Sequence, residues 1–316
     1  MVECLQNGGE MDINTRIRNL SVPEGRVDVV LDTDAYNEID DQFAITYLLS
    51  YAERLNIRAV YAAPFFNEKS DGPKDGMQKS YEEILKILTL AGRKVPVCKG
   101  SESYLAGEKE PVLSPAANHL VRLAGEYSPQ RPLYVVAIGA ITNVASALLL
   151  APEIAENIVI VWLGGHARHY HDTAEFNMMQ DVKAARVVMK SGAPFVQLPC
   201  AGVVDGFTIS GSELEYWLKG KNPLADYLAE NTIQEAQKYA SGTAWTRCIW
   251  DVTAVAWLVN VNNRFMLSRL VPTYLPSDDN FYMVNDNAPL QRYVYSIKRD
   301  ALMTDLMKRI ADFSLS

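Results

Sequence analysis

The sequence predicts an α/β fold in which a single open, mainly parallel (mixed) sheet carries helices on both faces. Short apolar runs of strand length alternate along most of the chain with longer runs that have a helical apolar stripe. This alternation is typical of βαβ units, whose parallel strands are buried on both faces. No change in composition marks a linker, and no repeat of fixed period is visible. We therefore read the 316 residues as a lead-in segment, 1–25, and a single domain, 26–316.

The elements are expected in the following order. Strands are predicted at residues 27–31, 56–63, 95–100, 133–138, 157–163, 194–198, 282–284 and 292–296. Helices are predicted at residues 42–52, 80–91, 116–126, 144–150, 181–190, 210–219, 222–240, 251–259 and 300–313. Ser80 and Glu83 have the spacing of a capping box at a helix start. The stretch 64–76 before them is rich in glycine, proline and aspartate, so it predicts a long loop at the sheet edge.

Composition limits the classes of partner. The formal net charge of −8 argues against nucleic acid or an anionic membrane surface as the main partner. The four cysteines are widely spaced without a C-x-x-C motif, so we expect them to be small packing residues in a reducing compartment. No apolar run approaches the roughly 18 residues of a membrane span, and the polar start does not resemble a secretory signal. We therefore expect a cytoplasmic protein, although a trimmed signal peptide would leave the same sequence.

Acidic side chains are concentrated after the first predicted strand, at Asp32, Asp34, Glu38, Asp40 and Asp41. They lie between a strand end and a helix start, the edge where open α/β sheets place their ligands. Because like charges repel, the cluster requires a cation, shared protons or full solvation. A hard divalent ion with oxygen ligands is the simplest answer. A solvated acidic loop is the alternative, since Asp40 and Asp41 also suit a helix start, but it leaves Asp32 and Asp34 unexplained.

This acid loop, taken together with three later segments, resembles the inosine–uridine-preferring nucleoside hydrolase family. The family motif after the first strand is D-x-D-x-x-x-D-D, and the loop here is two residues longer, with Tyr36 and Asn37 as the expected place of the extension. The four segments follow the family order, which makes the resemblance specific. The three later segments are 136–145 with Thr142, 174–185 with the sequence A-E-F-N, and 250–255 with Asp251.

The resemblance implies a nucleoside hydrolase-like fold with a Ca²⁺ ion at the carboxyl edge of the sheet. In that case Asp34, Asp41, Asp251 and the backbone carbonyl of Thr142 would bind the ion. Asp34 would also take a proton from the water that attacks C1′ of the sugar. Asp32 would lie behind these ligands and contact them rather than the ion. The implied reaction is hydrolysis of the N-glycosidic bond of a ribonucleoside, or a related N-riboside, to ribose and free base.

The resemblance further implies which side chains contact the nucleoside. Those expected to bind the sugar are Asp40, Asn67, Glu175 and Asn177, while His166 and Trp250 are expected to contact the substrate elsewhere. Trp250 stands where many members have a histidine that protonates the leaving base. Tryptophan can stack on a base but cannot act as such an acid. Leaving-group protonation is therefore absent, comes from water, or comes from the run His166–His171.

Each of these residues also has an ordinary structural interpretation. Asp251 could cap a helix, and Asp181 suits the start of the helix at 181–190. Thr142 could belong to a turn, while Glu175 and Asn177 could lie on a surface loop. His119 falls in a helical pattern and is expected to be structural.

Three hypotheses for the function remain open. The first is a Ca²⁺-dependent nucleoside hydrolase, and the second is a non-catalytic nucleoside or sugar binder that keeps the fold and the metal. The third is a hydrolase with zinc held by the histidines of the run 166–171. The family resemblance also implies a homodimer or homotetramer.

Overall fold

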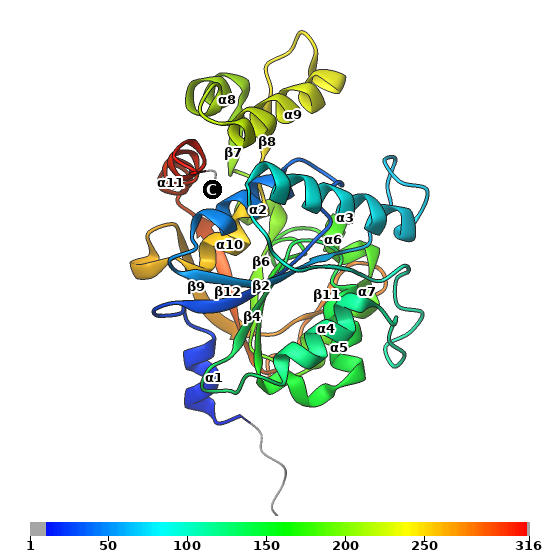
Figure 1. Cartoon of the computed structure of the whole chain (residues 1–316). Coiled ribbons are helices and arrows are strands. Elements are labelled where there is room, and N and C mark those ends of the chain that lie inside the picture. The colour runs from blue at the N-terminus through cyan, green and yellow to red at the C-terminus, as the bar shows by residue number, and fades with distance from the viewer. Residues whose placement is uncertain (1–10, 315–316) are drawn as a thin grey trace, which may run out of the picture.

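A computed structural model of the chain describes residues 11–314. Its centre is an eight-stranded sheet, seen nearly edge-on in Figure 1. Neighbouring strands run parallel except at one edge, where β9 is antiparallel to β12. This mainly parallel but mixed sheet confirms the predicted fold class. The strand order is β3 (Val97–Lys99), β2 (Leu55–Ala62), β1 (Val27–Thr33), β4 (Leu133–Ala137), β5 (Ile158–Leu163), β6 (Phe195–Leu198), β12 (Leu290–Ile297) and β9 (Met266–Pro272).

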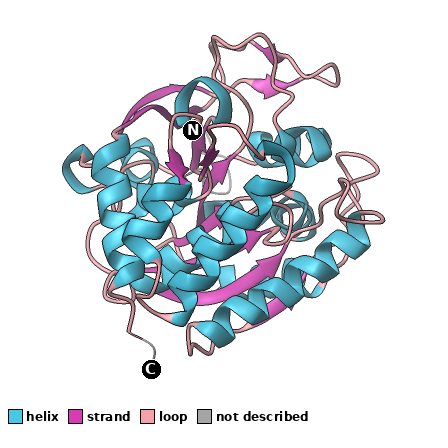
Figure 2. Cartoon of the chain, turned by 90° about the horizontal axis from the view of Figure 1, so that it is seen from above, coloured by secondary structure: helices cyan, strands magenta, loops and turns pink. Residues whose placement is uncertain are grey.

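Two helical layers cover the sheet, as the view in Figure 2 shows. The alternating side chains of β1 explain why both layers are needed, because Val29 and Leu31 join one apolar core and Val30 joins the other. The layer over Val29 and Leu31 contains α2 (Asp40–Ser50), α3 (Pro73–Leu90), α10 (Val252–Leu258) and α11 (Arg299–Ala311), with α8 (Gly211–Leu218) and α9 (Pro223–Ala240) projecting beyond them. The opposite layer contains α4 (Pro115–Ala124), α5 (Thr142–Leu150) and α7 (Val182–Lys190).

The strand order places a topological switch point beside β1. The chain passes from β1 to β2 and β3 on one side, then returns to pair β4 with the other side of β1. The loops that follow β1 and β4 therefore diverge, which opens a crevice at the carboxyl ends of these strands. The acid loop follows β1 at this crevice.

The structure adds a helix in the lead-in segment and moves the start of another helix. Within the described part of the lead-in, residues 11–25, there is a helix α1 (Ile13–Asn19) that is capped by Asp12 and tied to the domain by Arg16, which donates to the carbonyl of Gly192. Helix α3 begins at Pro73 rather than at Ser80, because proline suits the first helical position. Ser80 lies within this helix, where its buried hydroxyl donates to the Gly76 carbonyl one turn earlier, so it does not cap the helix start.

The remaining elements are small, and most of them were not predicted. The predicted strand at 282–284 is present as β11 (Tyr282–Met283), but it pairs with β10 (Leu275–Pro276) outside the central sheet. A second small sheet joins β7 (Thr208–Ser210) to β8 (Thr246–Cys248). A short helix α6 (Phe176–Gln180) precedes α7, and a single 3₁₀ turn covers Pro152–Glu156. The segments Cys200–Val204 and Val261–Asn263 are irregular turns with residues of positive φ, Gly202 in the first and Asn262 and Asn263 in the second. Among residues 11–314, no helix combines the length and the apolar character that crossing a membrane requires.

Candidate active site

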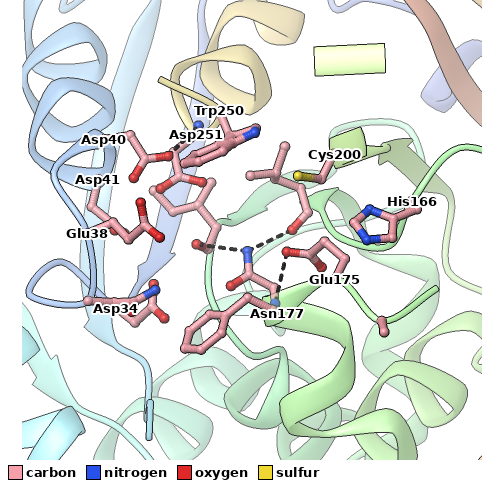
Figure 3. Close-up of a pocket in the computed structure, with 15 residues that line it drawn as sticks. Asp34, Glu38, Asp40, Asp41, His166, Glu175, Asn177, Cys200, Trp250 and Asp251 are labelled. Atoms are coloured by element: carbon pink, nitrogen blue, oxygen red, sulfur yellow. Dashed lines mark hydrogen bonds between the residues drawn. The ribbon is translucent and has the colours of Figure 1, made fainter. Parts of the chain in front are cut away.

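A cavity of about 220 Å³ opens at the carboxyl edge of the sheet, between the acid loop and the segment 174–177. Figure 3 shows the acidic side chains on one side of it and Glu175, Asn177, His166 and Cys200 on the other. No lysine or arginine is found among the described residues that line it. The lining residues are Asp34, Asn37, Glu38, Asp40, Asp41, Ile138, Leu163, His166, Ala174, Glu175, Phe176, Asn177, Cys200, Trp250 and Asp251.

The acid loop is held in place by its own backbone and by its neighbours. Asp34 follows the end of β1, and the backbone N–H of Asn37 donates to the Asp34 carbonyl at 2.7 Å, which closes a tight turn. Asp40 and Asp41 then form the first turn of α2. Thr33 donates from its hydroxyl to the Asp41 carboxylate. The fold therefore directs acids from both ends of the loop into one cavity.

Asp251 approaches these acids from the opposite end of the sequence. It precedes α10, but its carboxylate makes no capping hydrogen bond, so helix capping does not account for its presence. Its backbone N–H donates to Oδ2 of Asp40 at 3.2 Å. One carboxylate oxygen from each of Asp40, Asp41 and Asp251 lies within 4.8 Å of the other two. This is the geometry of a site that binds a cation through oxygen ligands.

The electrostatic environment of these acids is unfavourable without a cation. Burial raises the pKa of Asp40 to about 7, with a further contribution from Glu38. Burial, followed by repulsion from neighbouring carboxylates, raises the pKa of Asp34, Asp41 and Asp251 well above the ordinary range. Oδ2 of Asp34 is buried and has no hydrogen-bond partner among the residues described. The donor set therefore fits a hard divalent cation, which would compensate the repulsion.

The sequence assigned Asp40 to the sugar and Asp34 to the metal. The structure brings both into the same cavity, with Asp40 in the compact group of three carboxylates and Asp34 beside it. Asp32 is fully buried behind the loop and accepts a hydrogen bond from Nδ2 of Asn143 at 2.8 Å. Its burial raises its pKa to about 7.

Thr142 lies at the start of α5, fully buried and apart from the residues that line the cavity. Its hydroxyl donates to Oδ2 of Asp181 at 2.7 Å, while Oδ1 of Asp181 accepts from the Ala184 backbone. Asp181 therefore caps α7, as predicted.

Glu175 and Asn177 belong to the wall opposite the acids, where both are 5 % exposed, so the surface-loop interpretation is wrong. The Glu175 carboxylate accepts three backbone hydrogen bonds of 2.8–2.9 Å, from Gly165, Asn177 and Met178. Nδ2 of Asn177 donates to the carbonyls of Ile138 and Leu163. These bonds leave the Asn177 side-chain oxygen to accept from a ligand. Burial raises the pKa of Glu175 to about 7, although the backbone donors act against that change.

Asn67 does not line the cavity. Its amide donates to Asn37 and accepts from the backbone of Lys69, so both ends of the side chain are engaged. Asn37 lines the cavity in its place. Neither Asn37, Phe176 nor Cys200 was expected to contact a ligand, and Glu38 was expected only as a member of the acidic cluster. The longer acid loop was the available signal for Asn37. For Cys200 the signal was its position two residues after β6, at the same sheet edge.

The histidine run does not form a metal site. His166 lines the cavity, and its Nδ1 accepts from the Ala201 backbone at 3.2 Å, so the neutral ring carries its proton on Nε2. The His171 side chain is 75 % exposed and pairs with Asp172. Across the described chain, Asp40, Asp41 and Asp251 form the group suited to a metal, and the zinc hypothesis has no support. His119 bonds to the Tyr61 hydroxyl at 2.7 Å, which confirms its structural role.

Trp250 lines the cavity next to Asp251. Its Nε1 is buried and has no hydrogen-bond partner within residues 11–314. The side chain therefore offers an aromatic surface rather than an ionisable group to a ligand.

A family model and sequence relatives point to one family, and solved structures share the fold. The family model described as inosine-uridine preferring nucleoside hydrolase matches residues 29–284. The pyrimidine-specific ribonucleoside hydrolase RihA of Enterobacter sp. (strain 638) is 27% identical over 321 residues, covering 91% of this chain and 98% of its own length. Among solved structures, a plant nucleoside hydrolase has a TM-score of 0.72 at 19% identity, covering 92% of this chain and all of its own. The purine-preferring ribonucleoside hydrolase of Gardnerella vaginalis has a TM-score of 0.71 at 22% identity, covering 90% and 98%.

Proposed function

The chain belongs to the inosine–uridine preferring nucleoside hydrolase family and is an N-glycosyl hydrolase, and from this premise we propose that it splits a ribonucleoside, or a related N-riboside, with a Ca²⁺ ion and Asp34. The products are ribose and a free base. The family match confirms the resemblance inferred from the acid loop and the three later segments. The observation that carries the proposal is the convergence of Asp34, Asp40, Asp41 and Asp251 in one cavity.

The hydrogen-bonding character of the cavity supports a sugar ligand. The carboxylates of the acid loop, Glu175 and the side-chain oxygen of Asn177 are all acceptors. A ribose carries several hydroxyl groups, and each can donate one proton to such an acceptor. A cation would fill the remaining acceptor positions. The cavity therefore suits a polyhydroxylated ligand together with a divalent ion.

On the family resemblance, we assign the ion to Asp34, Asp41, Asp251 and the Thr142 carbonyl. Asp40, which groups with Asp41 and Asp251, would then lie beside the ion and bind a ribose hydroxyl. Carboxylate and carbonyl oxygens are the ligands that Ca²⁺ prefers, and the set matches that chemistry. When bound, the ion would neutralise part of the clustered charge and make a coordinated water more acidic. Asp32 would hold the loop from behind through Asn143.

Asp34 is the proposed catalytic base. It would accept one proton of the attacking water while the water oxygen bonds to C1′ and the C1′–N electron pair leaves with the base. The departing base would then take a proton from solvent water. Positive charge develops on the sugar in such a reaction, and the surrounding carboxylates would stabilise it. Glu175 and Asn177 would hold the sugar across the cavity.

The leaving base needs a different partner from the usual histidine, because Trp250 occupies that place. We propose that the Trp250 ring packs against the base and that His166 donates a hydrogen bond from Nε2. The Nδ1 contact to Ala201 favours the neutral ring, and burial lowers the pKa of His166. His166 would therefore act as a neutral donor rather than as a strong acid.

The test is release of reducing sugar from a panel of purine and pyrimidine ribonucleosides, with calcium and after chelation. We expect turnover that requires calcium and that falls by at least about a thousandfold in Asp34→Asn, since the base is lost. Asp71→Asn, an exposed aspartate away from the cavity, is the matched control. A wild-type protein that binds ribose tightly but releases no sugar from any nucleoside would instead be the non-catalytic binder.

We extend the proposal to assembly and location on the family resemblance. A homodimer or homotetramer is expected, and light scattering on the purified chain measures it. A cytoplasmic location is expected, and fractionation of the producing cell checks it.

A further inference from the structure

Asn37 lies at the expected place of the two-residue extension of the acid loop, and it is 7 % exposed in the wall of the cavity. Its backbone N–H closes the turn onto the Asp34 carbonyl, so its position is fixed relative to the proposed base. The orientation of its side-chain amide follows from a chain of hydrogen bonds that starts at a backbone group.

That chain begins at Lys69, whose backbone N–H donates at 2.9 Å to the side-chain oxygen of Asn67. A backbone N–H can only donate, so this contact identifies Oδ1 of Asn67 and leaves its Nδ2 to donate. Nδ2 of Asn67 contacts the Asn37 side chain at 2.6 Å, and Asn37 must therefore accept through Oδ1. The remaining group of Asn37 is its Nδ2 donor, which has no hydrogen-bond partner within the described chain.

Because Nδ2 of Asn37 is not one of the fully buried unpaired polar atoms of the described chain, it is open to the cavity and can donate to a bound ligand or to water. The groups on either side of Asn37 in this cavity, Asp34, Glu38 and Asp40, are carboxylates that can only accept when ionised. A sugar hydroxyl among them gives its proton to a carboxylate and keeps lone pairs that need a donor. The Asn37 amide supplies a neutral donor of that kind at this wall.

We propose that Asn37 donates from Nδ2 to a ribose hydroxyl oxygen, and that Asn67 is the positioning residue that fixes this direction. The inference rests on the proposed function, and it moves the sugar contact from Asn67 to a residue of the extended loop. Asn67 then acts through Asn37 and does not touch the substrate.

The test measures binding of methyl β-D-ribofuranoside by calorimetry in calcium buffer, together with its 2-, 3- and 5-deoxy analogues. Asn37→Ala is expected to weaken binding of the parent riboside by about tenfold, the effect of one neutral hydrogen bond. It is expected to leave unchanged the binding of the single analogue that lacks the accepting hydroxyl. Equal weakening of the parent and all three analogues, or no weakening at all, would overturn the proposal. Asn118→Ala, an exposed asparagine on α4, is the matched control.

The role of Asn67 has a readout of its own. Asn67→Asp still accepts from Lys69 but cannot donate, so the Asn37 amide must rotate and turn its oxygen toward the cavity. We expect Asn67→Asp to weaken binding of the riboside about as much as Asn37→Ala does. In an Asn37→Ala background, Asn67→Asp should cause no further loss of riboside affinity. Asn67→Ala lets the Asn37 amide adopt either orientation, so it is expected to weaken binding of the riboside less than Asn67→Asp does. If Asn67 only stabilised the fold, Asn67→Ala would weaken binding of the riboside more than Asn67→Asp does.

Failure of this inference can be distinguished from failure of the proposed function, because binding of the riboside requires no turnover. A wild-type chain that binds the riboside without hydrolysing nucleosides contradicts the proposed function alone. A wild-type chain that hydrolyses nucleosides but loses no riboside affinity in Asn37→Ala contradicts the Asn37 contact alone. A wild-type chain that binds no riboside also contradicts the Asn37 contact, whether or not it hydrolyses nucleosides.

Discussion

Calcium is expected to raise the midpoint of thermal unfolding, because the folded chain gathers four buried carboxylates that the unfolded chain separates. Sites of this ligand type that bind with a Kd of about 10 µM are common, and 1 mM calcium would then stabilise the folded state by about 2.7 kcal/mol. For a domain of this size, that corresponds to a rise of about 5 °C. Differential scanning calorimetry in calcium and in chelator measures it directly.

Asp251→Asn tests whether the acid cluster produces this shift. The substitution removes one of the three clustered carboxylates, so the calcium-dependent rise should shrink to about 1 °C or less. The same change relieves repulsion, so the variant should unfold at a higher temperature than the wild type in chelator. An equal calcium shift in Asp251→Asn and in the wild type would refute the assignment, as would a wild-type midpoint that chelator leaves unchanged. Asp71→Asn serves again as the control for a lost surface charge.

The pH dependence provides a second check on the same site. In the folded chain without calcium, the pKa of Asp40 is about 7, above its ordinary value of 3.8. A raised pKa means that the folded state holds the proton more tightly, so this contribution to stability is complete below about pH 3.8 and is lost as the pH rises through about 7. Protons compete with calcium for the same oxygens. The calcium shift should therefore be small at pH 5 and should grow toward pH 8.

Three other substitutions probe separate parts of the fold. Gly139→Ala places a Cβ 3.1 Å from Cγ and Oδ1 of Asp34, so we expect kcat to fall about 10- to 100-fold with little change in melting temperature. A kcat equal to that of the wild type would show that the base tolerates the displacement. His166→Ala is expected to lower kcat/KM about 10- to 100-fold at pH 7–8, and the wild-type profile should stay flat there because burial lowers the His166 pKa. Tyr47→Phe removes a 2.6 Å hydrogen bond to Asp305 and should lower the free energy of unfolding in urea by about 1–2 kcal/mol, without altering turnover.

Much of the central sheet could be predicted from the sequence because its strands are buried on both faces. Val29, Val30 and Leu31 form one of the apolar runs that such burial requires. The carboxyl edge was predictable for the same reason, since parallel strands bring their following loops to one side. Asp251 could be linked to the acid loop through the family resemblance alone, because no local pattern connects residues so distant in sequence.

The features of the fold and the site that were not predicted depend on contacts that local sequence patterns do not encode. Ser80 has the sequence of a helix cap, but Pro73 starts the helix earlier and buries the hydroxyl. The antiparallel edge strand β9 (Met266–Pro272) is half-buried and lacks a continuous apolar signature. The roles of Asn67 and Asn37 depend on a hydrogen-bond chain that only the folded loops create.

The sequence separation of 211 between Asp40 and Asp251 has a consequence for how the protein is made. A ribosome adds about 5–20 residues each second, so the acid loop leaves it roughly 10–40 seconds before the aspartate that completes the cluster. During that interval the nascent chain carries the early carboxylates without their distant partner. Tight cation binding must then await the docking of α10 on the finished sheet. Calcium retention would therefore report completed folding, and a fragment ending before residue 251 should lack it even where the first strands have paired.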